Sequence, residues 1–176
     1  MNLKLIGEIV GIFAIAEGFL IFISNKREKI LTFKLIDDVL WSACYFLQGA
    51  VTGGITCIVG IFRESVFLCR EKHKWADSVF WLFFFLVASL ISPTVECLSA
   101  GHFIPRTLLP ATGTGLAIVG NFNKKPMVMK VISIFANGLY LIYGFTISSV
   151  SVIIGDTVLI LSAIIGIIRE KKKSEN

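Results

Sequence analysis

Long apolar stretches alternate with short polar connections along the whole chain. The stretches cover residues 5–24, 30–50, 51–69, 78–94, 103–122, 127–145 and 147–168. Each holds about 17 to 22 residues, which at ~1.5 Å per helical residue matches a hydrocarbon core ~30 Å thick. The pattern predicts an all-α membrane protein with seven transmembrane helices.

Positive charge gathers in every second connection. The connections at 25–29, 70–74 and 123–125 and the tail at 169–173 contain most of the basic residues: Lys26, Arg27, Lys29, Arg70, Lys72, Lys74, Lys124, Lys125, Arg169, Lys171, Lys172 and Lys173. The opposite connections contain only Lys4 and Arg106. Because cytoplasmic loops carry an excess of Lys and Arg, we expect a multi-pass protein of the cell membrane. Its amino terminus should lie outside and its carboxyl terminus in the cytoplasm.

Composition argues against a soluble domain and a nucleic-acid partner. Hydrophobic residues make up 55% of the chain, and 15 residues are phenylalanine, unlike the mixture typical of soluble globular proteins. The formal charge of +5 falls mainly in the short cytoplasmic connections, where it orients the chain and attracts anionic lipid. We therefore expect the chain to associate with the lipid bilayer and not with nucleic acid.

The cysteines and histidines are too scattered for a disulfide framework or a metal site. Of the four cysteines, only Cys97 falls in an outer connection, so it has no partner there. His73 and His102 flank opposite faces of the membrane without a ligand-like spacing to a cysteine or carboxylate. We expect no metal and no cofactor.

Two parts of the chain align with each other. Residues 41–49 lie over residues 136–144 at one constant offset, which also brings Gly60 onto Gly155. Both copies begin at the outer face, so they are parallel repeats, and the stretch 78–94 is the linker that this arrangement needs. We expect a first three-helix bundle at 1–74, a linker helix at 75–100 and a second three-helix bundle with a basic tail at 101–176.

Three short motifs carry a resemblance to a known family. They are Tyr-Phe-Leu-Gln-Gly at 45–49, Gly-Ile-Phe-Arg at 60–63 and Ile-Ile-Gly-Ile-Ile-Arg at 164–169. Through them the chain resembles the YgjV-type bacterial inner-membrane proteins. Its two parallel bundles and linker also resemble the SWEET and PQ-loop transporter superfamily. The resemblance implies transport of a small molecule by alternating access between the bundles.

The chain also departs from the transporter pattern. It contains no Pro-Gln dipeptide, and Gly60 and Gly155 stand near the positions where sugar-binding relatives place an asparagine. The resemblance therefore does not support sugar in particular as the solute. Pro110 is the candidate hinge, because a proline within a helix removes a hydrogen bond and clashes with the preceding turn.

Ionisable side chains inside the apolar stretches are the strongest functional candidates. Each costs ~2.5 to 3.5 kcal/mol to insert, so it needs a partner or a wet cavity. The candidates for proton or ion coupling are Glu17, Asp38, Glu64 and Asp156. Arg63, near mid-membrane, either binds the solute or pairs with Glu17 or Asp38. Glu64 points ~100° away from Arg63 on a helix, so we do not expect those two to pair.

A polar and aromatic stripe follows the stretch 30–50. Its members recur at helical spacing: Lys34, Asp38, Trp41, Tyr45 and Gln48. We expect Trp41 and Tyr45, with Asn137 and Tyr140 of the equivalent stretch and Arg63, to bind the solute. The alternative for both tyrosines is an interfacial aromatic belt. Lys34 and Asp38 should form an i,i+4 pair.

An enzymatic role is not expected. Gly155-Asp156 and Asp37-Asp38 resemble the motifs of two-aspartate intramembrane proteases only faintly, because residue 153 is Ile where a glycine is required. The sequence thus predicts a transporter for a small polar or anionic solute, and its partners would be that solute, the lipid bilayer and further copies of the chain in a homo-oligomer. The alternative is an accessory or receptor-like membrane protein that transports nothing.

Overall fold

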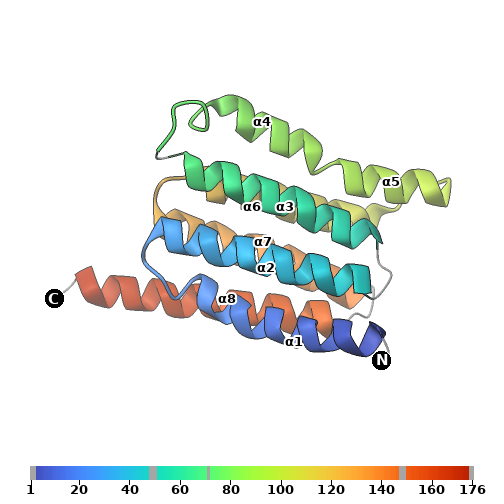
Figure 1. The fold of residues 1–176 in the computed structure, drawn as a ribbon, viewed down its shortest axis with the longest axis horizontal. Helices are drawn as coiled ribbons and strands as arrows, with labels where there is room; N and C mark the ends of the chain where they lie inside the picture. The colour runs from blue at the N-terminus through green and yellow to red at the C-terminus, as the bar shows by residue number, and fades with distance from the viewer. Residues whose placement is uncertain (1–2, 48–50, 71, 147–149, 175–176) are drawn as a thin grey trace.

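The computed structural model describes residues 3–47, 51–70, 72–146 and 150–174 (Figure 1). Gln48 and Gly49 of the aligned motif, and Ile147 at the start of the last apolar stretch, lie outside these ranges. Regular structure in the described ranges is entirely helical, which confirms the all-α prediction. The elements are α1 (Leu3–Ile21), α2 (Arg27–Leu47), α3 (Val51–Cys69), α4 (Val79–Ala88), α5 (Ile91–Ala100), the 3-10 helix η1 (Pro105–Thr107), α6 (Leu108–Phe122), α7 (Pro126–Thr146) and α8 (Val150–Ser174).

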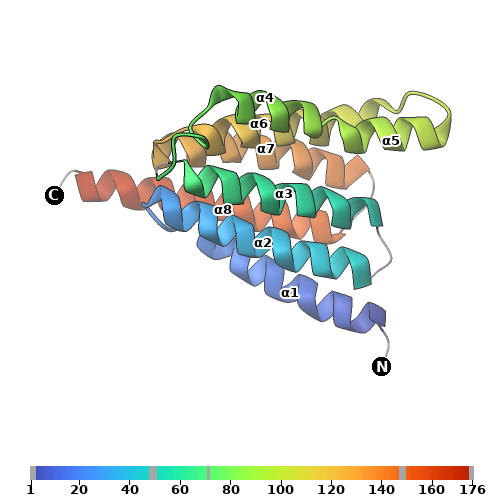
Figure 2. The same ribbon diagram turned by 45° about the horizontal axis from the view of Figure 1, so that its top comes forward.

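The long helices lie side by side in two layers (Figures 1 and 2). In one layer α2 packs against both α1 and α3, and in the other α7 packs against both α6 and α8. The layers meet most extensively between α1 and α8, while α4 packs against α6 and α3 at the opposite edge. The amino and carboxyl termini lie at opposite ends of the stack, and α1 and α6 run in the same direction.

Prolines move two of the expected helix boundaries. The predicted helix at 78–94 is broken after Ala88 and continues as α5. Pro93 has no N–H to bond the carbonyl of Ser89 and clashes with it, so the regular helix cannot continue through this point. The predicted helix at 103–122 begins only at Leu108, because Ile104 is extended before Pro105 as residues before proline usually are.

Within the part of the chain that the structure describes, three helical segments are long and apolar enough to cross a membrane: Val79–Ala100, Pro126–Thr146 and Val152–Lys172. The sequence predicted seven. The helix α6 has 15 residues and is therefore only ~22 Å long, and α2 has Lys34, Asp37 and Asp38 in its interior. These features separate α2 and α6 from the three apolar segments by length and composition.

Most of the buried apolar side chains in the described chain form one cluster toward one end of the stack. We call it the basic end, since the connections at 22–26, 72–78 and 123–125 and the end of α8 lie there (Figure 1). The cluster comprises Ile21, Phe22, Ile30, Leu31, Val66, Phe67, Ala76, Phe85, Ile118, Met129 and Ala163. Nearby, the Ser162 hydroxyl of α8 accepts a hydrogen bond from the Phe22 N–H (3.1 Å) and donates one to the Phe19 carbonyl (2.6 Å). This contact ties α8 to the end of α1.

Candidate functional site

An ionic network lies where α2, α3 and α6 meet. The Arg63 guanidinium on α3 contacts Glu64 Oε1 through Nη2 at 2.9 Å and through Nε at 3.0 Å. Its Nη2 also lies 3.7 Å from Oδ2 of Asp38 on α2. The Glu64 side chain is fully buried and that of Arg63 is 15% exposed. The guanidinium therefore lies between two carboxylates that are largely shielded from solvent.

Asn121 of α6 extends this network to the second layer. Its amide nitrogen donates to Glu64 Oε1 at 2.6 Å, and its amide oxygen accepts from Lys34 Nζ at 2.8 Å. The Lys34 ammonium also lies 5.0 Å from the centre of the Phe22 ring. One amide thus links an anion of α3 to a cation of α2. Asn121 was not among the residues selected from the sequence, although an amide at the end of an apolar stretch also needs a partner.

Two expected pairings are corrected by this geometry. Arg63 pairs with Glu64, which the helical angle had argued against, because α3 faces both α2 and α6 and a long guanidinium can bend to its neighbour. Lys34 binds Asn121 in place of Asp38. The Asp38 pairing with Arg63 is as expected. Glu17 is not in contact with Arg63: both its carboxylate oxygens are buried without a hydrogen-bond partner among the described residues.

Gly60 makes the close approach of α2 and α3 possible. A Cβ atom at this position would lie 2.7 Å from Cγ and 2.8 Å from Oδ1 of Asp38, closer than atoms can pack. Asp38 Oδ2 and Glu64 Oε2 are buried and have no hydrogen-bond partner in the described part of the chain. Buried oxygens of this kind normally have partners, so the network keeps unused acceptors.

The aromatic candidates lie further from the basic end. The Trp41 and Tyr45 rings are 5.6 Å apart, and Trp41 reaches across the layers to within 3.7 Å of where a Cβ atom of Gly155 would lie. The Tyr140 hydroxyl bonds the Thr114 hydroxyl of α6. This contact favours an interior position for Tyr140 over an interfacial belt.

The remaining sequence candidates lie nearby or apart. Asn137 is half-buried on α7 one turn before Tyr140, and Asp156 is buried on α8. Pro110 lies in the first turn of α6, where proline is tolerated because the N–H groups have no helical partner. Its hinge role remains a prediction.

Arg27, counted from the sequence as a loop charge, is instead buried at the basic end. Its Nε donates to the Asn123 carbonyl at 3.0 Å, and its Nη2 donates to the carbonyls of Phe67 at 3.1 Å and Asn121 at 3.0 Å. Phe67 and Asn121 belong to the last turns of α3 and α6, whose carbonyls have no helical partner and where helix dipoles favour a cation. Arg27 therefore joins the two layers.

Lys130 is a second buried cation that charge counting did not single out. Its ammonium contacts Glu170 Oε2 at 2.7 Å, Asn25 Oδ1 at 2.7 Å and the Gly166 carbonyl at 3.2 Å. These contacts join α7 to α8 and to the connection between α1 and α2. Among the described residues, no group of three His, Cys, Asp or Glu side chains could hold a metal ion.

The helical fold, the many exposed large apolar side chains and the ionic network inside the stack define an integral membrane protein. The chain belongs to Imp-YgjV, a family of bacterial inner membrane proteins, whose family model matches residues 5–174. This confirms the resemblance to the YgjV-type proteins. No curated protein and no solved structure matched the sequence.

Proposed function

We propose that this inner membrane protein transports a small polar solute by alternating access between the α1–α3 layer and the α6–α8 layer. The observation that carries the proposal is the ionic network at their interface, from Lys34 and Asp38 through Arg63 and Glu64 to Asn121. Ionisable groups within a membrane are costly and mark solute or ion pathways. Because the network joins the two layers through Asn121, its hydrogen bonds would break and form again when the layers move.

The proposed repeat and the link to SWEET and PQ-loop transporters draw support from the helix bounds. The middle helices α2 and α7 each have 21 residues, and both their first and last residues are 99 positions apart. This offset differs by four residues, about one helical turn, from the pairing of Trp41 with Ala136. The offset of 99 residues pairs Asp38 with Asn137 and Trp41 with Tyr140. Trp41 and Tyr140, both proposed to bind the solute, then occupy equivalent positions.

The unused hydrogen-bonding groups favour a solute that donates hydrogen bonds. Arg63 is already engaged by two carboxylates. Apart from Arg70 Nη1 at the basic end, the buried side-chain atoms left without hydrogen-bond partners in the described chain are acceptors, on Glu17, Asp38 and Glu64. A neutral or cationic solute therefore fits better than an anion. The same three carboxylates, with Asp156, are the proposed carriers of a coupling proton or ion.

The packing favours entry from the end opposite the basic end. The apolar cluster and the three carbonyl contacts of Arg27 close the basic end. A solute that reached the network from the other side would be released after these contacts opened. We propose that the basic end is cytoplasmic, with seven passes and an outer amino terminus.

Uptake by the purified protein in proteoliposomes tests the transport proposal. We would supply labelled amino acids, amines, polyols and carboxylates and compare the protein with Asp38→Asn. Glu28→Gln removes one carboxylate charge from an exposed position of the same helix and is the matched control. Uptake that Asp38→Asn abolishes and Glu28→Gln preserves supports transport. No uptake of any solute would favour the accessory or receptor-like alternative, in which Arg63 only holds the helices together.

Cysteine labelling tests the orientation separately. Cys97 lies on α5 near the end opposite the basic end, and Cys69 is the last residue of α3 at the basic end. A membrane-impermeant maleimide added to intact cells should label Cys97 and leave Cys69 unmodified. Labelling of Cys69 alone would reverse the orientation.

A further inference from the structure

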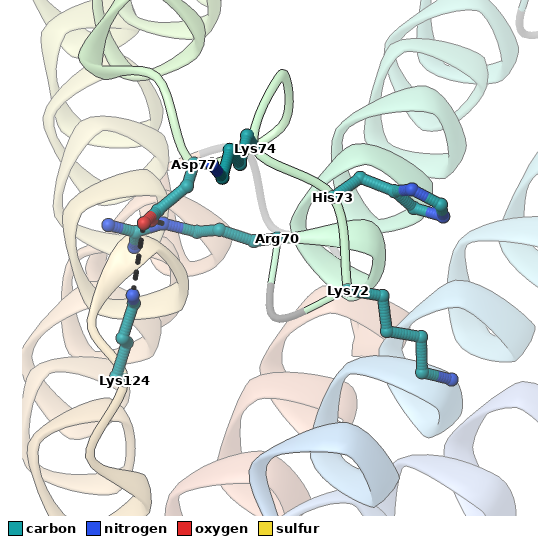
Figure 3. Close-up of a pocket in the computed structure, with 6 residues that line it drawn as sticks. All are labelled: Arg70, Lys72, His73, Lys74, Asp77 and Lys124. Atoms are coloured by element: carbon teal, nitrogen blue, oxygen red, sulfur yellow. Dashed lines mark hydrogen bonds and ion pairs between the residues drawn. The ribbon is translucent and has the colours of Figure 1, made fainter.

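A cleft of about 270 Å³ opens at the basic end, away from the ionic network (Figure 3). The α3–α4 connection and the start of the α6–α7 connection form it. Its lining residues are Arg70, Lys72, His73, Lys74, Asp77 and Lys124. Four of these side chains carry a permanent positive charge and one a negative charge, so the described lining has an excess of positive charge.

Asp77 occupies the cleft between two of its cations. Its carboxylate accepts a hydrogen bond from Arg70 Nε at 2.6 Å and one from Lys124 Nζ at 3.1 Å (Figure 3). These hydrogen bonds, first that from Lys124 and then that from Arg70, lower the pKa of Asp77 below its ordinary value. One carboxylate cannot neutralise four cations. Lys72 has a further carboxylate neighbour, Glu28, at 3.3 Å.

Arg70 also has an unused donor. Its side chain is only 10% exposed and stacks on Phe122, with the guanidinium carbon 3.4 Å from the ring centre. The Nη1 group is buried and has no hydrogen-bond partner in the described part of the chain. A buried guanidinium donor normally has an acceptor. The oxygens of a phosphate group are the acceptors that suit an arginine best.

The surroundings of the cleft favour a lipid over a soluble phosphate. Immediately after Asp77, the start of α4 exposes the apolar side chains of Val79, Phe80 and Phe83. Trp75 is exposed beside the cleft, stacks on His73 and accepts a hydrogen bond from the Trp81 indole at its carbonyl (3.0 Å). Tryptophan is enriched at the level of lipid headgroups. The cleft thus adjoins a surface suited to acyl chains.

We propose that this cleft binds the phosphate of an anionic phospholipid headgroup in the leaflet at the basic end, while the acyl chains lie along α4. Arg70 and Lys124 contact the phosphate, and Lys72 and Lys74 add attraction at longer range. This site does not depend on the proposed transport function. Because Asp77 competes for the same donors, the bound lipid displaces it at least in part.

Thermal unfolding of the full chain in a neutral detergent tests the site. The probes are phosphatidylglycerol, phosphatidylcholine and inorganic phosphate. We expect phosphatidylglycerol to raise the unfolding temperature more than the other two. Lys74→Gln with Lys124→Gln should weaken this effect roughly tenfold or more in lipid concentration, because basic residues at a membrane surface each contribute to the attraction. Lys26→Gln with Lys29→Gln removes the same charge from exposed positions outside the cleft and should leave the effect nearly unchanged.

Three results of this experiment would overturn the proposal, and a separate variant adds a fourth. Equal stabilisation by phosphatidylcholine would mean that no headgroup is selected, and equal stabilisation by inorganic phosphate would identify a soluble anion. An equal loss in both double variants would mean that net charge alone is responsible. Asp77→Asn supplies an independent test, since it removes the competing carboxylate and should tighten phosphatidylglycerol binding several-fold. Unchanged or weaker binding by that variant would also contradict the site.

Discussion

The two ends of the helix stack are held together differently. At the basic end, Arg27 joins α2 to the last turns of α3 and α6, and Lys130 joins α7 to α8. At the opposite end, hydrogen bonds of the described residues include local ones, such as those between Thr107 and the Ile104 carbonyl and between His102 and the Ala100 carbonyl. Among the described residues, Arg27 through the Asn121 and Asn123 carbonyls and Lys130 through Asn25 therefore tie the two layers together at the basic end.

The direction of the helices explains this difference. The helices α1, α3, α6 and α8 all end at the basic end (Figure 1). Each helix end presents carbonyls without helical partners and the negative end of a helix dipole. Basic side chains at this end can therefore satisfy backbone groups as well as orient the chain in the membrane. Arg27 serves the first purpose, whereas exposed Lys26 and Lys29 are free to serve the second.

The largest expected effect comes from Arg63, which lies in the ionic network between the two ends of the stack. Arg63→Gln leaves the carboxylates of Glu64 and Asp38 without their cation and should cost about 3 to 5 kcal/mol of unfolding free energy. Unfolding in detergent by denaturant measures the loss. Adding Glu64→Gln should restore much of the stability, whereas adding Glu17→Gln should not. Rescue by Glu17→Gln alone would mean that the contacts of Arg63 are assigned wrongly.

Substitution of Arg27 tests the contacts that tie the layers together at the basic end. Arg27→Gln removes charge-assisted hydrogen bonds to three carbonyls and should cost about 3 kcal/mol. It should also increase the rate at which a maleimide labels Cys69 in the detergent-solubilised protein, since Cys69 lies at the same end. Arg27→Lys keeps the charge but replaces the planar guanidinium, which donates from two separate nitrogens, by one compact ammonium, so it should recover only part of the loss. An unchanged labelling rate in Arg27→Gln would contradict the role of Arg27 in closing this end.

Gly60 tests the packing beside the network. Gly60→Ala forces the Asp38 carboxylate away from α3 and should cost about 2 kcal/mol, as overpacking usually does. Gly138→Ala is the matched control, because a Cβ atom there meets nothing within 4 Å. That control should be neutral or stabilise the helix by up to about 1 kcal/mol. Equal effects of both substitutions on the unfolding midpoint would mean that Gly60 is not needed for the approach of α2 to α3.

The sequence predicted the helical elements better than the contacts between them. Hydropathy located the long helices, and the errors at Ser89 and Ile104 follow from Pro93 and Pro105, whose local effects could have been included. The partnership of Asn121 with Lys34 and Glu64 could not be predicted in this way. It depends on how α6 packs against α2 and α3, which are distant in the chain, and the amide itself gives no indication of its partners.

The smallest expected effect concerns Asp77, which is exposed and links Arg70 of the α3–α4 connection to Lys124 of the α6–α7 connection. Hydrogen bonds from Lys124 and Arg70 lower its pKa, so its contribution to stability is complete above the ordinary aspartate value of about 3.9 and disappears as the pH falls through the lowered pKa. The difference in unfolding temperature between the protein and Asp77→Asn should therefore stay constant from pH 5 to 8 and shrink only below about pH 4. Added salt should reduce the difference, because exposed ion pairs are screened. If the difference in unfolding temperature changed between pH 5 and 8, another group would titrate at this contact. The link between Arg70 and Lys124 would then depend on a second titrating group as well as on Asp77.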